Sequence, residues 1–228
     1  MKTAKNGGLI EPLIVTLKST DLKNQAALAA QALEKGGVIA TPTDTIYGLA
    51  ALANNIKAVR KIYEIKGRNQ AKPVAICVAD IDDVYKWGQV PISKELLKTL
   101  LPGPVTLCFN RQDCLNPELN PETSLIGIRI PDYPFIQEVC RQSRLPLALT
   151  SANVSSEKSS LAIDEFADLY AHLSVIFDGG TLGQTEESRL GSTVVDLSHP
   201  GLFKIIRPGS AERQTIKKLI DFGLVRDD

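Results

Sequence analysis

Short apolar runs alternate with amphipathic segments along most of the chain. Residues 21–35 place Leu22, Ala26 and Leu33 on one helical face, and Gly36-Gly37 ends that helix. The next residues, 38–40 (VIA), form the kind of short apolar run that is typical of a buried strand. This order predicts a helix that packs back onto the strand that follows it.

The same two patterns recur as far as the last residues of the chain. Further strands are expected at residues 73–78, 105–109, 125–130, 147–150, 175–177, 193–197 and 203–206, and further helices near 56–63, 95–101, 135–142, 164–171 and 212–222. Strands that alternate with helices in this way predict an α/β fold with helices packed on a mixed, mostly parallel open sheet.

The chain has 228 residues, 43% of them hydrophobic, which is enough for one well-packed domain. No internal repeat or shift of composition marks a second domain. We expect residues 1–12 to form a flexible tail and residues 13–228 to form a single catalytic domain.

Charge and cysteine content narrow the class of protein. Lys plus Arg and Asp plus Glu number 26 each, so no basic excess drives non-specific binding to nucleic acid, although a local basic cleft stays open. The four dispersed cysteines and two histidines lack metal-ligand spacing, and we expect no metal held by protein side chains alone. No apolar stretch has transmembrane or secretory-signal length, so we expect a cytoplasmic protein, with a mitochondrial pool only from an alternative start.

Cations and polar groups recur where apolar segments end. Lys66-Gly67-Arg68 and Lys72 occupy one helix-to-strand connection, and Ser151-Ala152-Asn153 follows an apolar strand. Arg129 and Arg207 also lie at predicted strand ends. Each segment alone fits an ordinary solvated turn, but their recurrence favours one cationic cleft at the ligand-binding edge of the sheet.

Several common catalytic patterns are missing. His172 and His199 fall in a helix pattern and a turn, so a histidine-driven mechanism is not expected. The chain has neither a Gly-x-Ser-x-Gly elbow nor a glycine-rich phosphate loop that ends in Lys-Ser or Lys-Thr. If a nucleotide binds, side-chain cations must hold its phosphates.

Seven segments, in order over about residues 22–210, resemble the YrdC-like family, the threonylcarbamoyl-AMP synthases. They are 41–49 (TPTDTIYGL), 66–68 (KGR) with 72–73 (KP), 101–106 (LPGPVT), 128–131 (IRIP), 150–153 (TSAN), 192–196 (STVVD) and 206–209 (IRPG). Residues 189–209 are most similar to the short animal form, and the extra C-terminal domain of longer relatives is expected to be absent.

The resemblance implies a twisted sheet with a concave, positively charged cleft. It implies a nucleotidyltransferase that condenses L-threonine, bicarbonate and ATP into L-threonylcarbamoyl-AMP and pyrophosphate, with magnesium bound alongside ATP. A separate tRNA threonylcarbamoyl transferase complex would use the product to modify an adenosine in tRNA. Weak binding of tRNA to the cleft is also open.

The resemblance assigns roles to residues of this chain. Lys66 and Arg68 match catalytic positions beside the phosphates. Positions that contact ATP are matched by Arg68, Lys72, Leu125, Asn153, Leu161 and Arg207, where Leu125 and Leu161 can offer only backbone groups or packing. Positions that hold threonine are matched by Thr45, Cys77, Arg129, Ser151 and Ser192. Cys77 replaces a histidine of many microbial relatives, and Lys72 replaces a frequent asparagine. Strand alternation places Cys77 on the same face as Ala75, and no lysine, arginine or histidine adjoins it in sequence, so we expect a structural thiol that lines the threonine pocket.

Two other functions compete with this interpretation. A concave basic cleft also suits an RNA-binding module, whose affinity would fall steeply with salt and need no threonine. A carbamoyl-phosphate-using transferase with a related domain would instead need carbamoyl phosphate as its donor.

Overall fold

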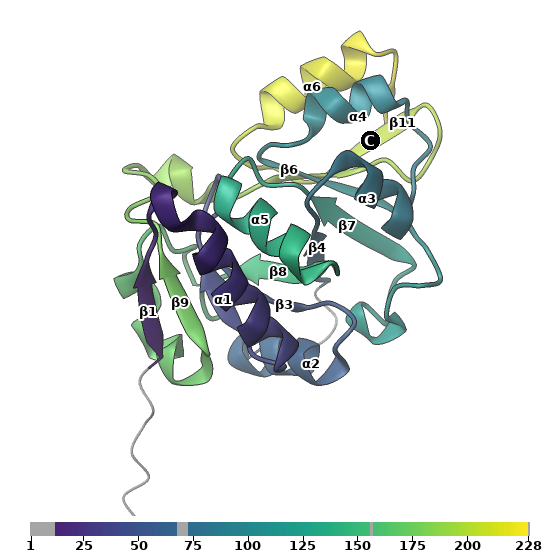
Figure 1. Cartoon of the computed structure of the whole chain (residues 1–228). Coiled ribbons are helices and arrows are strands. Elements are labelled where there is room, and N and C mark those ends of the chain that lie inside the picture. Colours follow the sequence, from purple (N-terminus) through teal and green to yellow (C-terminus); the bar gives the residue numbers. More distant parts are fainter. Residues whose placement is uncertain (1–11, 68–72, 156, 228) are drawn as a thin grey trace, which may run out of the picture.

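A twelve-stranded sheet forms the centre of the computed structural model, which describes residues 12–67, 73–155 and 157–227 (Figure 1). Its strands are β1 (Leu13–Thr16), β2 (Ile39–Thr41), β3 (Gly48–Leu52), β4 (Ala75–Cys77), β5 (Gly88–Gln89), β6 (Val105–Arg111), β7 (Leu125–Arg129), β8 (Leu147–Ser151), β9 (Val175–Asp178), β10 (Thr193–Asp196), β11 (Leu202–Arg207) and β12 (Val225–Arg226). Along the sheet they follow the order β1-β9-β2-β3-β8-β4-β7-β6-β10-β11-β12, and β5 pairs with β6.

Helices occupy the connections between these strands. The α-helices are α1 (Leu22–Glu34), α2 (Ile56–Ile65), α3 (Ile81–Trp87), α4 (Lys94–Leu100), α5 (Pro134–Ser143) and α6 (Glu212–Asp221). Four short 3-10 helices complete the described elements: η1 (Ser19–Asp21), η2 (Pro117–Leu119), η3 (Ile163–His172) and η4 (Glu186–Leu190). None of the helices within the described ranges is long and apolar enough to cross a membrane.

The pairing of the strands confirms a mixed, open α/β sheet with flanking helices. Five pairs of described strands are parallel, β1–β9, β2–β9, β4–β7, β6–β10 and β11–β12. Six are antiparallel, β2–β3, β3–β8, β4–β8, β5–β6, β6–β7 and β10–β11. The sequence pattern favours parallel pairs, but antiparallel pairs are at least as numerous among the described strands. The reason is that several consecutive strands, such as β2 and β3, pair directly with each other.

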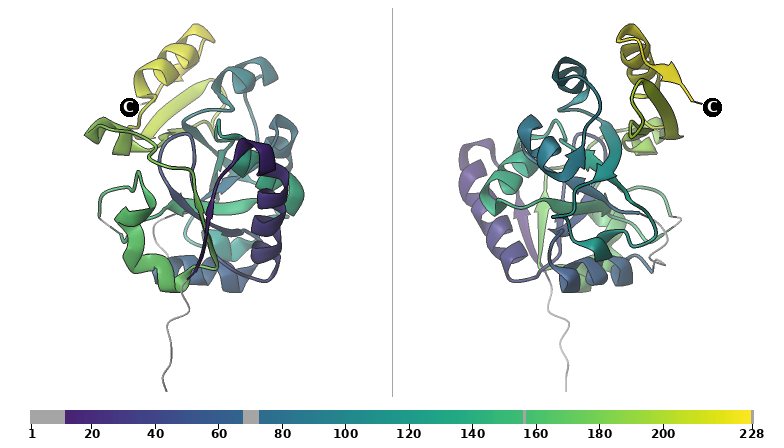
Figure 2. Two further views of the ribbon diagram at one scale, coloured as in Figure 1. Left: turned by 60° about the vertical axis from the view of Figure 1, so that its left-hand side comes forward. Right: turned by 90° about the vertical axis from the view of Figure 1, so that its right-hand side faces the viewer.

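Two hydrophobic cores lie on opposite faces of the sheet. Strand β3 shows the division, because Ala50 and Leu52 belong to one core, whereas Leu49 and Ala51 belong to the other. Helices α1 and α5 pack against each other and close the first core, as Figure 1 shows. The opposite core is covered by α2, α3, α4 and α6. Figure 2 shows α6 and β11 at one end of the sheet, far from β1.

The α1–α5 face of the sheet is only partly covered by helices. Leu149 packs in the α1–α5 core and also lines an open cavity farther along the same face. Residues two positions apart in a strand share a face, which brings Ser151 of β8 and Arg129 of β7 to the cavity as well. The fold thus leaves one stretch of this sheet face uncovered by helices and open to a ligand.

Most of the expected elements are present, and two differences from the sequence pattern are informative. Residues 164–171 were expected to form an α-helix, but η3 is a 3-10 helix interrupted by the non-helical backbone of Phe166 (φ −130°, ψ 30°). Helix α3 was not anticipated from the sequence, although Asp83 accepts a hydrogen bond from the Asp80 N–H at its start (3.3 Å). Of the expected tail at residues 1–12, only Pro12 is described.

Candidate active site

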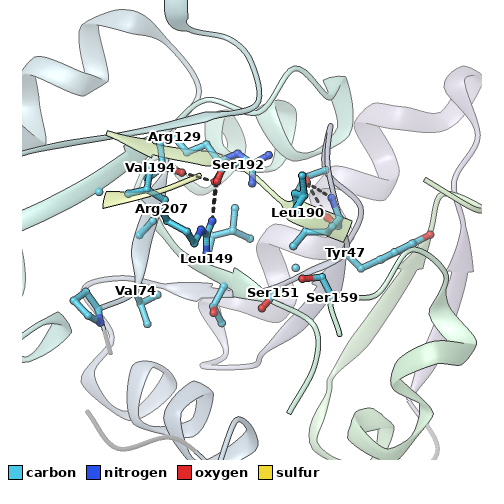
Figure 3. Close-up of a pocket in the computed structure, with 18 of the residues that line it drawn as sticks. Tyr47, Val74, Arg129, Leu149, Ser151, Ser159, Leu190, Ser192, Val194 and Arg207 are labelled. Atoms are coloured by element: carbon cyan, nitrogen blue, oxygen red, sulfur yellow. Dashed lines mark hydrogen bonds between the residues drawn. The ribbon is translucent and has the colours of Figure 1, made fainter. Parts of the chain in front are cut away.

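A cavity of about 190 Å³ opens on the α1–α5 face, beyond the two helices. Seven strands, β3, β4, β6, β7, β8, β10 and β11, contribute to its walls together with helix η4 and four loops (Figure 3). Its lining consists of Thr43, Ile46, Tyr47, Gly48, Pro73, Val74, Ala75, Thr106, Cys108, Gly127, Arg129, Leu149, Thr150, Ser151, Ser159, Leu190, Ser192, Val194 and Arg207. Hydroxyl groups and two arginines among small apolar side chains suit a small, polar and anionic ligand.

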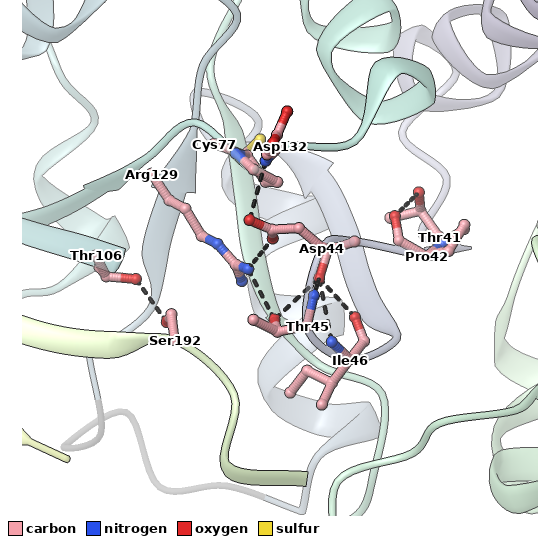
Figure 4. Close-up of polar contacts among 12 residues, drawn as sticks. Thr41, Pro42, Asp44, Thr45, Ile46, Cys77, Thr106, Arg129, Asp132 and Ser192 are labelled. Carbon is pink, nitrogen blue, oxygen red and sulfur yellow. Dashed lines mark hydrogen bonds and ion pairs between the residues drawn. The ribbon is translucent and has the colours of Figure 1, made fainter. Parts of the chain in front are cut away.

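The loop between β2 and β3 is held in shape by Thr43. Its hydroxyl donates to the Ile46 carbonyl (2.7 Å) and accepts from the N–H groups of Thr45 (3.2 Å) and Ile46 (3.3 Å). Thr43 is 2% exposed, so these bonds are shielded from water. The turn presents Asp44 and Thr45 to the end of β7, as Figure 4 shows.

Arg129 ends β7 with its side chain buried at the cavity wall. One terminal nitrogen, Nη2, donates to the Asp44 carboxylate and to the Thr45 hydroxyl (2.7 Å). The other Asp44 oxygen accepts from the Asp132 N–H (3.0 Å). Arg129 is 6% exposed, and its Nε has no hydrogen-bond partner among the described residues. Nε is closed off from solvent, so a ligand carboxylate in the cavity would pair with Nη1, which makes no hydrogen bond to a described residue.

Ser192 and Arg207 form another wall of the cavity. The Arg207 guanidinium donates to the Ser192 carbonyl (2.9 Å) and hydroxyl (3.3 Å). The Ser192 hydroxyl also lies 2.8 Å from the Thr106 hydroxyl. In Figure 3, Arg207 and Ser192 lie on the same side of the cavity as Arg129, while Ser151 and Ser159 lie below them in that view. A cation and two hydroxyls therefore lie side by side on this wall.

Lys66 contacts Ser151 of the cavity lining and is almost fully buried (1% exposed). It caps the C-terminal end of α2, and its ammonium group donates to the carbonyls of Ser151 and Asn153 (2.7 Å each). The Asn153 side-chain oxygen accepts from the same group (2.9 Å). This α2–β8 clasp, formed by Lys66, Ser151 and Asn153, fixes the loop that leaves β8 at the cavity.

An ion pair fixes the rim of the cavity. Arg189 donates to both oxygens of Glu165 (2.6 and 3.1 Å) and to the Ser159 carbonyl (2.7 Å). The hydrogen bond from Arg189 lowers the pKa of Glu165 below its usual value. Because Leu190 follows Arg189 and both Leu190 and Ser159 line the cavity, the pair holds two parts of the rim in register.

Four of the residues assigned by the family resemblance line the cavity: Arg129, Ser151, Ser192 and Arg207. Thr45, Lys66 and Asn153 are absent from the lining but form hydrogen bonds with or around those four residues. Leu125 and Leu161 are not among the lining residues. Both backbone groups of Leu161 are engaged, its N–H with Glu165 (3.0 Å) and its carbonyl with Leu182 (2.9 Å). Arg68 and Lys72 lie outside the described residues.

Cys77 does not line the cavity. Its side chain is fully buried, and its sulfur lies 3.5 Å from that of Cys140 on α5. Strand alternation does place Cys77 on the same face as Ala75, as expected, but α5 covers that part of the face. A different thiol, Cys108 of β6, lines the cavity, and burial raises its pKa to about 12, so this group stays protonated at neutral pH.

Sequence reasoning did not single out several residues of the site, among them Asp44, Thr106, Cys108 and Gly127. Two of them had a detectable signal, because Asp44 and Thr106 fall inside segments that carry the family resemblance. Gly127 had none. A Cβ there would lie 2.9 Å from the Thr106 methyl group and 3.4 Å from the Ala75 Cβ, so its lack of a side chain keeps the cavity open.

The chain belongs to the Sua5, YciO and YrdC family, because the family model described as "Telomere recombination" matches residues 31–209. It is similar to the threonylcarbamoyl-AMP synthase of Bos taurus, with 52% identity over 199 residues that cover 86% of this chain and 72% of the bovine protein. Identity to the human threonylcarbamoyl-AMP synthase is 53% over 189 residues, which cover 82% of this chain and 68% of the human protein.

A solved structure extends the similarity to three dimensions. The structure of P. abyssi Sua5 complexed with L-threonine aligns with a TM-score of 0.79 and 28% sequence identity. The alignment covers 94% of this chain and 62% of the Sua5 chain, so this chain spans less than two thirds of that protein. The α/β architecture expected from the sequence is therefore the architecture of this family.

Proposed function

We propose that this protein is an L-threonylcarbamoyl-AMP synthase whose product serves the threonylcarbamoyl modification of tRNA. The observation that carries the proposal is the cavity itself, in which Arg129, Arg207 and the Ser192 hydroxyl meet. Support comes from relatives of that name at 52–53% identity and from a similar structure that holds L-threonine. The proposal makes the protein an enzyme of the nucleotidyltransferase class.

Threonine fits the lining if its carboxylate pairs with Arg129, whose Nη1 makes no hydrogen bond to a described residue. Its hydroxyl would then bind the Ser192–Thr106 pair, whose oxygens lie 2.8 Å apart. Ala75, Gly127 and Leu149 offer the apolar surface that its methyl group needs. A site that hydrogen-bonds the substrate hydroxyl rejects an isosteric methyl group, because its own polar groups would then be left unpaired.

The reaction needs fixed charge more than a strong base. The threonine amine attacks bicarbonate and water leaves, which forms a carbamate. A carbamate oxygen then attacks the α-phosphorus of ATP, and the bond to pyrophosphate breaks. Because bicarbonate, carbamate and the phosphates are all anionic, pre-positioned cations and hydroxyls lower the barrier by holding them together.

ATP would extend from the Arg207 wall. Arg68 and Lys72 stay candidates for its phosphates by family resemblance alone. Lys66 is proposed to act through the α2–β8 clasp and its positive charge beneath Ser151. Magnesium would enter with ATP, because Mg²⁺ commonly takes its ligands from substrate phosphates and water.

A reducing compartment such as the cytoplasm belongs to the same proposal. The sulfurs of Cys77 and Cys140 lie 3.5 Å apart and form no disulfide. Neighbouring thiols stay reduced in this way in intracellular compartments.

The decisive experiment measures pyrophosphate release from ATP and magnesium, with and without L-threonine and bicarbonate. We expect release only when both are present, with threonylcarbamoyl-AMP detected by mass spectrometry. With L-valine, which lacks the hydroxyl, we expect kcat/KM to be lower than with threonine by at least about a hundredfold. Release that does not depend on threonine, or equal use of valine, would contradict the proposed function.

A further inference from the structure

Asp44 is the only described carboxylate with a hydrogen bond to the Arg129 guanidinium, and its own surroundings are unusually closed. The side chains of Arg129 and Asp44 are 7% and 9% exposed, so the pair is shielded from water. One Asp44 oxygen accepts from Arg129 and the other accepts from the Asp132 N–H just before α5 (Figure 4). The carboxylate is therefore fixed from both sides.

The arrangement leaves one edge of the guanidinium for the cavity. The hydrogen bonds of Arg129 to described residues all come from Nη2, which donates to Asp44 and Thr45. Nε has no partner among those residues and is closed off from solvent, so Nη1, which makes no hydrogen bond to them, is the nitrogen that faces the cavity. A guanidinium is planar, so fixing one terminal nitrogen also fixes the direction of the remaining N–H groups.

We propose that Asp44 is a positioning residue that holds Arg129 in the orientation needed to bind the carboxylate of the amino-acid substrate. The inference rests on the proposed function. Asp44 does not touch the substrate. It acts through Arg129, and the backbone N–H of Asp132 holds it in turn. A long arginine side chain without this support would lose rotamer freedom on binding, and that loss would weaken affinity.

An opposite effect of Asp44 is also conceivable on charge alone, because a carboxylate beside Arg129 offsets part of its attraction for an anionic substrate. The two effects predict opposite changes in threonine KM, which makes them separable. Asp44→Asn removes the charge and leaves a single acceptor oxygen, which cannot serve both Arg129 and the Asp132 N–H. Asp44→Glu retains the charge and both oxygens.

The test is the steady-state rate of threonine-dependent pyrophosphate release at saturating ATP and bicarbonate, with threonine varied. For Asp44→Asn we expect threonine KM to rise about ten- to hundredfold, with kcat changed less than about threefold, because Asp44 acts on binding through Arg129 and does not touch the reacting atoms. Asp44→Glu should recover part of the loss. Asp168→Asn, which removes one exposed carboxylate outside the site, is the matched control and should leave both constants unchanged.

L-Threoninol, which has an alcohol in place of the carboxylate, separates positioning from general damage. Its inhibition constant against threonine should be the same for the wild type and Asp44→Asn, because it gives Arg129 no carboxylate to bind. Circular dichroism and the thermal midpoint identify a variant that fails to fold, in which case Asp44→Glu and threoninol carry the test.

Each outcome decides one question. An unchanged or lower threonine KM in Asp44→Asn, a collapse of kcat at constant KM, or an equal loss of threoninol binding would overturn the positioning role while leaving the synthase activity intact. A wild-type protein without threonine-dependent pyrophosphate release would instead overturn the proposed function.

Discussion

At the scale of single residues, the open space of the cavity depends on the absence of a side chain at Gly127. Thr106 and Ala75 stand on either side of the missing Cβ. The Thr106 hydroxyl is held by Ser192, so its methyl group cannot turn away without breaking that 2.8 Å contact. A single methyl group at this glycine would therefore crowd the substrate without touching the arginines.

We expect Gly127→Ala to raise threonine KM about tenfold or more, with the overall fold retained, because overpacking at this wall falls on the open cavity. Adding Thr106→Ser removes the clashing methyl group, retains the hydroxyl and should restore most of the affinity. The single Thr106→Ser variant is the control. Steady-state kinetics with varied threonine checks the series, and a double variant no better than Gly127→Ala would refute this account of the crowding.

Some of these residues were visible in the sequence and others were not. Arg129, Ser151, Ser192 and Arg207 stand at strand ends, where a local pattern already indicates a binding edge. Asp44 acts through Arg129, which is 85 residues away, and Gly127 acts through Thr106 and Ala75, which are also distant in sequence. Spacing along the chain does not reveal such contacts. The family resemblance assigned Arg129 to threonine binding, but its engagement with Asp44 is a property of the fold.

At the scale of elements, the α2–β8 clasp joins the end of a helix to the end of a strand through one buried ammonium. Lys66 reaches from α2 to the carbonyls of Ser151 and Asn153. Burial of an ammonium is costly, and the surrounding oxygens offset that cost only while the geometry holds. The clasp thus couples the stability of this region to the position of Ser151 in the cavity wall.

Lys66→Met should lower the free energy of unfolding by about 2–4 kcal/mol, because buried carbonyls lose their donor. Urea denaturation measures this loss, and turnover should fall about a hundredfold or more as the β8 loop and a fixed charge are lost together. Lys57→Met, on the exposed side of α2, is the matched control and should be nearly neutral. Wild-type stability and turnover in Lys66→Met would mean that the clasp is dispensable.

Element prediction succeeded where periodicity is strong and failed where packing decides. α1 and α5 carry clear apolar faces and lie within one or two residues of their expected bounds. β3 (GLAAL) is built of small residues with weak strand preference, and it forms because β2 and β8 pair with it on both sides. The 3-10 geometry of η3 likewise reflects the surroundings of Phe166, which packs against Tyr47, more than its own sequence.

At the scale of the whole molecule, equal numbers of acidic and basic residues leave no net charge to attract nucleic acid. The alternative of an RNA-binding module then rests on a local cationic surface. For such a surface, affinity arises mainly from released counterions and depends steeply on salt.

We expect tRNA to bind weakly, with affinity falling steeply between about 50 and 200 mM salt, while threonine-dependent pyrophosphate release changes far less. Fluorescence anisotropy with labelled tRNA and the pyrophosphate assay, run in the same buffers, make the comparison. Tight, salt-resistant tRNA binding that threonine and ATP do not affect would favour the RNA-binding module.

The residues that line the cavity are spread from Thr43 to Arg207 and are therefore synthesised at different times. The Thr43 turn follows β2 early in synthesis, whereas Ser192 and Arg207 emerge roughly 150 residues later, and β6 must wait for β10 to pair with it. At roughly 5–20 residues per second, that gap lasts roughly 8–30 s. Within it, from the completion of β6 until β10 follows, β6 has an unpaired edge, a natural target for chaperones or for aggregation. A nascent chain that stalls before β10 would keep much of the apolar core and still lack a wall of the binding cavity, so completed synthesis sets the supply of active protein.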